Sequence, residues 1–134
     1  MVEDCLMCRI IRGEIPSYTL YEDEEVKVFL DIYPISKGHS LVVPKKHYVN
    51  IFDIPASEMS FTKKIPGIAK KLKEITGATG MNIIQNNGRD AGQLIDHIHF
   101  HLVPRSPADG INLVPSKSEL AAETAKEIVE MFKK

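Results

Sequence analysis

The chain has 134 residues, which is enough for one domain with its own core and too few for two ordinary domains. Its 17 basic residues nearly balance 18 acidic ones, so its charge predicts no nucleic-acid partner and no anionic membrane partner. No apolar run reaches the roughly 18 residues of a membrane span, and the acidic residues near the N-terminus are wrong for a signal peptide. We therefore expect a single cytoplasmic domain over residues 1–134.

A short helix is predicted from Cys5 to about Gly13, and it begins with the pair Cys5 and Cys8. A redox pair is expected to follow a strand, which is missing here. Haem attachment requires a histidine directly after the second cysteine, where Arg9 stands. Half of a zinc site and two free surface thiols both remain open.

Three strands are predicted next from their β-branched and aromatic content: Tyr18–Asp23, Val26–Ile32 and His39–Pro44. Asp31 lies where the second of these strands leaves the apolar pattern. His39 and His47 lie on either side of Pro44, and their local spacing does not make them one site.

A helical segment is predicted over residues 57–76, with Ser57 as its N-cap. Pro66 and Gly67 interrupt the segment, so we expect a kink or two shorter helices. The predicted apolar face consists of Phe61, Ile65, Ile68 and Leu72.

The segment Gly80–Gln85 predicts a further strand, and residues 86–93 form a loop rich in glycine and side-chain amides. Such a loop can bring backbone N–H groups close to an anion. A β-hairpin turn of the Asn-Gly type explains the same composition, and locally it is the simpler interpretation.

Three histidines alternate with apolar residues in the stretch His97-Ile98-His99-Phe100-His101-Leu102-Val103, which Pro104 is expected to end. Strict alternation predicts a strand with Ile98, Phe100 and Leu102 facing a core and the histidines on the other face. Neighbouring histidines would then lie about 6.5–7 Å apart. Beyond them, Ser118 is expected to cap a last amphipathic helix that runs to about Phe132.

Two mechanisms fit three clustered imidazoles. They could hold a catalytic zinc ion, or one could attack phosphorus while its neighbours position and protonate the substrate. Cys5 and Cys8 would claim zinc in a structural site together with two histidines, which leaves the remaining imidazoles free for metal-independent chemistry.

The histidine stretch resembles the histidine triad signature of the HIT superfamily of nucleotide hydrolases and transferases. The resemblance runs from about residue 4 to residue 105 and leaves residues 106–134 as an extension. It includes Cys5-x-x-Cys8, Phe29-Leu30-Asp31-Ile32-x-Pro34, Gly38-His39-x-Leu41-Val42-Val43-Pro44-Lys45-Lys46-His47 and Asn86-x-Gly88-x-x-x-Gly92-Gln93. The pattern looks most like the branch of purine nucleoside phosphoramidases.

The resemblance implies an α+β fold in which a long helix and a C-terminal helix pack against an antiparallel sheet. Hydrolysis of nucleoside phosphoramidates or dinucleoside polyphosphates is implied, on a purine nucleotide of the AMP or GMP type. His99 would attack the α-phosphorus, His101 would bind the phosphate and assist the leaving group, and His39 would orient the nucleophile. The implied substrate contacts are Asp31 with the ribose, Ile32 with the base, and Asn86, Gly92 and Gln93 with the phosphate.

The resemblance also implies a structural zinc ion that the chemistry does not require, and a homodimer. The implied zinc ligands are Cys5, Cys8, His47 and His97. Two features depart from the family pattern: Leu94 stands where several phosphoramidases have a serine, and the residues after Pro104 do not match the eukaryotic tail. A nucleotide-binding regulatory protein without turnover and a zinc hydrolase with three histidine ligands remain alternatives.

Overall fold

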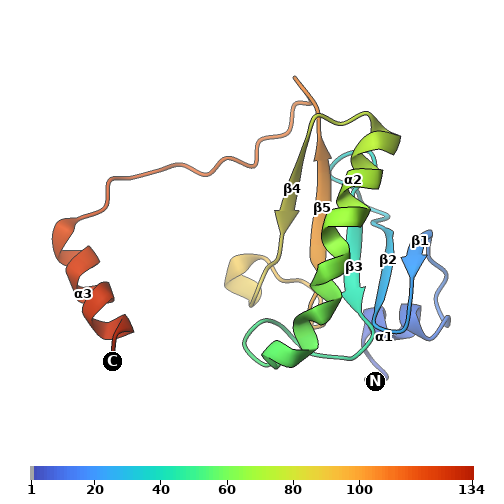
Figure 1. Ribbon diagram of the computed structural model, residues 1–134, viewed down its shortest axis with the longest axis horizontal. Coiled ribbons are helices and arrows are strands. Elements are labelled where there is room, and N and C mark those ends of the chain that lie inside the picture. The colour runs from blue at the N-terminus through green and yellow to red at the C-terminus, as the bar shows by residue number, and fades with distance from the viewer. Residues whose placement is uncertain (1) are drawn as a thin grey trace.

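An antiparallel sheet of five strands, in the order β1-β2-β3-β5-β4, forms the centre of the computed structural model, which describes residues 2–134. The strands are β1 (Thr19–Glu22), β2 (Val26–Leu30), β3 (Ser40–Pro44), β4 (Gly80–Ile84) and β5 (Phe100–Arg105). The helices are α1 (Leu6–Ile11), η1 (Ala56–Lys64), α2 (Ile65–Thr76), η2 (Arg89–Ala91) and α3 (Ala122–Phe132). The predicted α+β class is confirmed, and Figure 1 shows the arrangement.

Helix α2 covers one face of the sheet (Figure 1). The apolar face predicted for residues 57–76 is confirmed, because Phe61 of η1 and Ile65 and Leu72 of α2 are buried in the core and Ile68 packs beside them. The core on this side consists of Val26, Val28, Val42, Ile54, Phe61, Ile65, Leu72, Ile98 and Leu102. Burial of these apolar side chains is the main force that fixes α2 on the sheet.

Helix α1 packs on the opposite face, where a second core consists of Cys5, Met7, Cys8, Ile10, Phe29, Leu41 and Val43. The buried side chain of Lys27 reaches this layer and donates to the carbonyl oxygen of Ile10, 3.2 Å away, near the end of α1. A cation at this end of a helix interacts favourably with the helix dipole. Strands β2 and β3 are thus buried on both faces.

The strand register assigns the histidines to a face. Leu41 of β3 lies opposite His101 and Val42 lies opposite Phe100. Directly opposed residues share a face, so His101 lies on the α1 side and Phe100 on the α2 side. Strand β5 begins at Phe100, three residues later than expected, and continues through Pro104 to Arg105. Pro104 does not end the strand, because the ladder to β3 stops at Leu102 and only β4 pairs with it there.

The segment predicted as one interrupted helix is a 3₁₀ helix followed by α2. Pro66 lies in the first turn of α2, where a helix needs no N–H donor, so it starts the helix and does not kink it. The prediction of Ser57 as N-cap is wrong, because the 3₁₀ helix begins one residue earlier, after Pro55.

Residues 106–121 form an extended segment that carries α3 away from the rest of the chain (Figure 1). None of the residues of α3, all of which the structure describes, is buried. The expectation that a C-terminal helix packs against the sheet is therefore wrong for this chain. The expected cap is also wrong, because α3 begins four residues after Ser118, with Ala121 at the N-cap. Its predicted end at Phe132 is confirmed.

Among residues 2–134, no helix combines the length and the apolar composition that crossing a membrane demands.

Replacing Phe61 by alanine tests the packing of η1, the 3₁₀ helix that leads into α2, on the sheet. Phe61 is 1% exposed, and its ring meets that of Phe100 edge to face with centroids 6.0 Å apart. We expect Phe61→Ala to lower the free energy of unfolding by about 3–5 kcal/mol, because it leaves a cavity in the core. Urea denaturation measures this change. The control Phe52→Ala, at a side chain that is 83% exposed, should stay within about 0.5 kcal/mol of wild type.

Candidate functional site

His99 has the hydrogen-bonding arrangement of a nucleophile. Its side chain is 8% exposed, and its Nδ1 lies 2.6 Å from the backbone carbonyl oxygen of His97. A carbonyl oxygen only accepts hydrogen bonds, so Nδ1 carries the proton and donates it. Burial also lowers the pKa of His99, which keeps the imidazole neutral at pH 7. A neutral ring protonated at Nδ1 has its lone pair on Nε2, the atom available for attack on an electrophile.

His39 contacts His101 and thereby fixes its tautomer. The backbone N–H of Ile35 donates to Nδ1 of His39 at 3.0 Å, so Nδ1 must be unprotonated and the proton of the neutral ring is on Nε2. Nε2 of His39 lies 2.9 Å from Nδ1 of His101, so Nε2 donates and Nδ1 of His101 accepts. The proton of a neutral His101 is then on its own Nε2. A backbone amide thus determines, through two rings, which atom of His101 is a donor.

His101 stays neutral over the physiological range. Burial lowers its pKa to about 4, and the neighbouring rings of His99 and His39 act in the same direction. The ring centroids of His99 and His101 lie 5.0 Å apart. A lone pair on His99 and an N–H donor on His101 are therefore presented side by side. This pair can attack a phosphorus atom and bind an oxygen or nitrogen attached to it.

Asp31 joins this group at the end of β2. Its Oδ2 lies 3.6 Å from Nε2 of His39, and its Oδ1 accepts the backbone N–H of Tyr33 at 2.8 Å. The carboxylate opposes the effect of burial on the pKa of His39, which nevertheless stays lowered. Ile32, the next residue, is 68% exposed. The structure thus places a carboxylate next to the His39–His101 pair, and an exposed apolar residue follows it in the chain.

The loop after β4 is held together by Gln93. Its side chain is 1% exposed and bonds four groups: the backbone N–H of Gly88, the amide of Asn50, and the carbonyl oxygens of Val49 and Ile95. All the hydrogen-bonding groups of the Gln93 amide are engaged in these bonds. Gln93 therefore orders the loop from within it.

Asn86 and Gly92 lie close together within the same loop. Gly92 has a φ of +90°, and a Cβ atom there would lie 3.8 Å from the amide nitrogen of Asn86. The positive φ is one that an L side chain rarely adopts, so glycine is required for this turn. Leu94, two residues on, is 81% exposed.

A second cluster of side chains joins the start of α1 to His97. Nδ1 of His97 lies 3.3 Å from Sγ of Cys5, 3.5 Å from Sγ of Cys8 and 3.1 Å from Nδ1 of His47. Sγ of Cys8 lies 3.3 Å from Nδ1 of His47. These four atoms lie within 4.8 Å of one another and could hold a metal ion. Two sulfur and two nitrogen atoms are a ligand set that zinc prefers.

The tautomer of His97 also suits a metal ligand. Its Nε2 lies 2.8 Å from the carbonyl oxygen of Pro44, so Nε2 carries the proton and Nδ1 offers a lone pair to the cluster. Burial lowers the pKa of His97 to about 4 and raises that of Cys5. The neutral imidazole is the form that binds metal, and a divalent cation would favour the thiolate.

Asp31, His39 and His101 also lie close enough together to be considered as a metal site. His39 argues against that role. A neutral imidazole that binds metal through Nε2 must carry a proton on Nδ1, and Nδ1 of His39 already accepts the N–H of Ile35. Two donors would then face each other at 3.0 Å. The geometry fits a chain of hydrogen bonds better than a cation.

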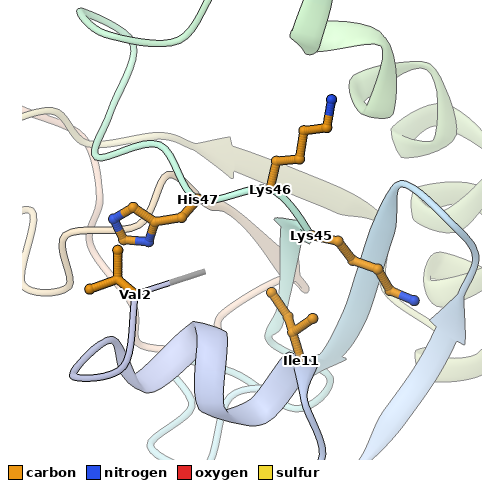
Figure 2. Close-up of a pocket in the computed structure, with 5 residues that line it drawn as sticks. All are labelled: Val2, Ile11, Lys45, Lys46 and His47. Carbon is orange, nitrogen blue, oxygen red and sulfur yellow. The ribbon is translucent and has the colours of Figure 1, made fainter.

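A pocket borders the cluster of Cys5, Cys8, His47 and His97 at His47 and is shown in Figure 2. Val2 and Ile11 line it together with His47, whereas the amine ends of Lys45 and Lys46 point away from the imidazole (Figure 2). Both lysines are paired, Lys45 with Glu22 at 2.8 Å and Lys46 with Glu58 at 3.0 Å. None of the predicted catalytic histidines lines this pocket, so it is separate from the His99 site.

The HIT domain family model matches residues 12–108, most of the chain. The chain belongs to the HIT family. A HIT-like protein of Methanocaldococcus jannaschii is 50% identical over 107 residues, which cover 79% of this chain and 82% of the relative. An adenosine 5′-monophosphoramidase of Saccharomyces cerevisiae is 44% identical, covering 75% and 62%, respectively. An adenylylsulfatase of Arabidopsis thaliana is 43% identical over 79% of this chain, which spans only 54% of that protein.

Solved structures give the same result. A Streptococcus mutans protein superposes with a TM-score of 0.94 at 40% identity over 99% of this chain and 85% of its own. A Bacillus subtilis HIT protein gives 0.90 at 36% identity, covering 98% and 96%. A zinc-bound histidine triad protein from Mycobacterium smegmatis gives 0.77 at 36% identity, covering 86% and 84%.

Three backbone groups of this site were not predicted: the carbonyl oxygens of His97 and Pro44 and the N–H of Ile35. Each selects the tautomer of an imidazole. Every residue has a carbonyl and nearly every residue an N–H, so the side-chain pattern carries no signal for them. Only the folded backbone reveals which ones meet a ring.

Acidification should destabilise the fold through His101. Its pKa of about 4 in the folded chain is below the ordinary value of 6.5, so between these values the unfolded chain binds more protons. The contribution of His101 to the free energy of unfolding is therefore fully present above pH 6.5. It is lost as the pH falls towards 4, by at most about 1.4 kcal/mol per pH unit. Urea denaturation at pH 7.5, 6 and 5 measures the slope. We expect His101→Gln to flatten it, and an unchanged slope would contradict this assignment.

Proposed function

We propose that this chain hydrolyses phosphoramidates, or related derivatives, of purine nucleoside 5′-monophosphates through a nucleotidyl group bound to His99. The observation that carries the proposal is the hydrogen bond from Nδ1 of His99 to the carbonyl oxygen of His97, which leaves the lone pair on Nε2. Relatives named adenosine 5′-monophosphoramidase and adenylylsulfatase support the substrate class, because both names describe cleavage at an adenosine phosphate.

In the first step, Nε2 of His99 forms a bond to the α-phosphorus as the bond from phosphorus to the leaving nitrogen breaks. His101 donates a hydrogen bond from its Nε2–H to the leaving nitrogen and keeps that proton. The leaving nitrogen takes a proton from a water molecule and departs as an amine. In the second step, a water oxygen attacks the same phosphorus, the bond from phosphorus to Nε2 of His99 breaks, and the water releases one proton to the solvent. The products are the nucleoside monophosphate and the free imidazole.

The remaining polar groups of the site would position the nucleotide. Asp31 would accept the ribose hydroxyls and Ile32 would flank the base. Asn86 and Gly92 would contact the phosphate. Gln93 would act indirectly, because its four internal bonds hold the loop that carries these groups. His39 would position His101 through its Nε2–H, 2.9 Å from Nδ1 of that ring.

Zinc bound by Cys5, Cys8, His47 and His97 is proposed as a structural ion. It would fasten the start of α1 to His97 and would take no part in the attack on phosphorus. The donor set and the hydrogen bond from His97 to Pro44 support this assignment. A zinc-bound neighbour in the same family is consistent with it.

We also propose that two copies of the chain form a dimer. Within residues 2–134, strand β4 pairs with β5 alone, so its outer edge is open. Apart from Asn82 the strand is apolar, and it has neither a lysine nor a proline to discourage pairing with another edge.

Replacing His99 by alanine tests the nucleophile. With an adenosine phosphoramidate that releases a fluorescent amine, we expect His99→Ala to lose at least about 10³-fold in kcat/KM. Acid-labile label from an α-³²P substrate should be trapped on wild type and be absent from the variant. Isothermal titration with AMP should show that the variant still binds nucleotide, which separates lost chemistry from lost folding. If wild type binds AMP tightly but shows neither turnover nor trapped label, the chain is a nucleotide-binding module.

Replacing Cys8 by serine tests the zinc assignment. We expect about one zinc per chain in the wild type and very little in Cys8→Ser, measured by inductively coupled plasma mass spectrometry. Loss of the ion should also lower the free energy of unfolding by about 2 kcal/mol or more. Asp31→Asn serves as the control and should keep its zinc. A catalytic zinc held by three histidines would instead survive in Cys8→Ser, and removing it would abolish turnover in a folded protein.

A further inference from the structure

The strand that leads into the amide-rich loop ends beside the proposed catalytic residues. Ile84, the last residue of β4, lies opposite His101 of β5 in the antiparallel ladder. Directly opposed residues share a face of the sheet. Continued by two residues, the same register would set Asn86 opposite His99. The backbone that follows Ile84 therefore decides where Asn86 lies relative to the nucleophile.

The side chains on either side of Asn86 bond to each other and are here called the amide pair. Nε2 of Gln85 donates to Oδ1 of Asn87 at 2.7 Å, and Nδ2 of Asn87 donates back to Oε1 of Gln85 at 2.7 Å. The same Nε2 donates to the carbonyl oxygen of Asn86 at 3.1 Å, and the same Oδ1 accepts the N–H of Ile51 at 2.8 Å. Turning either amide over would set donor against donor or acceptor against acceptor. The backbone thus fixes the orientation of both amides.

A short piece of backbone connects the amide pair to the histidine segment. The carbonyl oxygen of Tyr48 accepts the N–H of Ile98, the residue before His99, at 2.8 Å. Three residues after Tyr48, the N–H of Ile51 bonds to Asn87. The same piece of backbone therefore holds the amide-rich loop and the segment that carries His99, and it sets the separation between them.

Asn86 itself has a side-chain amide that is free to bind a ligand. The residue is half-buried, and its amide nitrogen lies 3.8 Å from the position that a Cβ atom on Gly92 would take. Among residues 2–134, no group forms a hydrogen bond with this amide, whereas the amides on either side of it are both engaged. A fixed backbone with an uncommitted amide is what preorganised binding of a phosphate oxygen requires.

We propose that Gln85 and Asn87 are positioning residues for the phosphate of the nucleotide. The amide pair holds the backbone of Asn86 and ties it, through Ile51, to the segment that carries His99. Both residues act through Asn86 and need no contact with the reacting atoms. This inference rests on the proposed function, because it takes Asn86 to bind the phosphate.

Replacing Gln85 by methionine removes the amide and keeps the length of the side chain. We expect Gln85→Met to raise KM for the fluorogenic phosphoramidate, and the dissociation constant for AMP, about fivefold, since a hydrogen bond to the phosphate is misplaced. The kcat should stay within about twofold of wild type, because the phosphate is charged both before and during the attack. Asn82→Ala is the matched control. It removes a hydrogen bond to Arg105 from the strand that precedes the loop, and it should leave KM unchanged.

A double-mutant cycle tests whether Gln85 acts through Asn86. We expect Asn86→Ala to raise KM about tenfold, and Gln85→Met to raise it no further in that background. A merely structural loss would act in both backgrounds, so a further increase on top of Asn86→Ala overturns the inference. An unchanged KM in Gln85→Met alone also overturns it and leaves turnover by His99 intact.

The AMP titration separates this inference from the catalytic proposal. A wild type that binds AMP without turnover refutes the catalytic proposal alone, because the dissociation constants of the same variants still report on the amide pair. A wild type that neither binds AMP nor hydrolyses the phosphoramidate refutes both.

Hydrogen exchange at Ile51 tests the connection between the two loops without any substrate. Ile51 is 39% exposed, yet its N–H donates to Asn87, so we expect slow exchange in the wild type. Gln85→Met removes no bond of Ile51 itself, but it releases Asn87 and should speed this exchange more than about threefold. Equal exchange rates in the wild type and in Gln85→Met, measured by two-dimensional NMR, would contradict the role of the amide pair.

Discussion

The candidate site depends on the hydrogen bond between Nδ1 of His99 and the carbonyl oxygen of His97. His97 contributes to both clusters: its side chain faces Cys5, Cys8 and His47, and its carbonyl selects the tautomer of His99. Whatever fixes the ring of His97 therefore also fixes the backbone oxygen that orients the nucleophile. A structural metal ion could influence the attack on phosphorus in this way without contacting the substrate.

Burial keeps the imidazoles in the neutral state that these tautomers require. His97, His99 and His39 are almost fully buried, and the pKa of each is lowered mainly by desolvation. An added proton on His39 would have to face the N–H of Ile35, and one on His99 would occupy Nε2. The hydrogen bonds and the low polarity of the site thus oppose protonation together. The result is a set of rings whose donor and acceptor atoms are assigned before any ligand arrives.

The strands and the α2 core could be predicted from the sequence because alternation and 3.6-residue spacing record burial directly, as Phe100, Leu102 and Phe61 illustrate. Zinc chemistry predicted that two histidines would join Cys5 and Cys8, whereas the choice of His47 and His97 came from the resemblance to the HIT family. Alternation failed at His97 and His99, which were expected on the face opposite the apolar core and are nevertheless buried, with exposures of 0% and 8%. The position of α3 could not be predicted either. Its amphipathic pattern demands a covering surface but does not specify whether that surface lies on the same chain.

Gly38, just before His39, has a φ of +89°, and a Cβ atom there would lie 2.6 Å from Cγ2 of Thr76 at the end of α2. The loop that carries His39 is therefore in direct steric contact with the helix on the opposite face of the sheet. A single hydrogen atom acts as the spacer between them, and it sets how far His39 reaches towards His101. A larger side chain at position 38 would displace either helix α2 or the loop that carries His39. Displacing the loop would change the 2.9 Å distance between Nε2 of His39 and Nδ1 of His101.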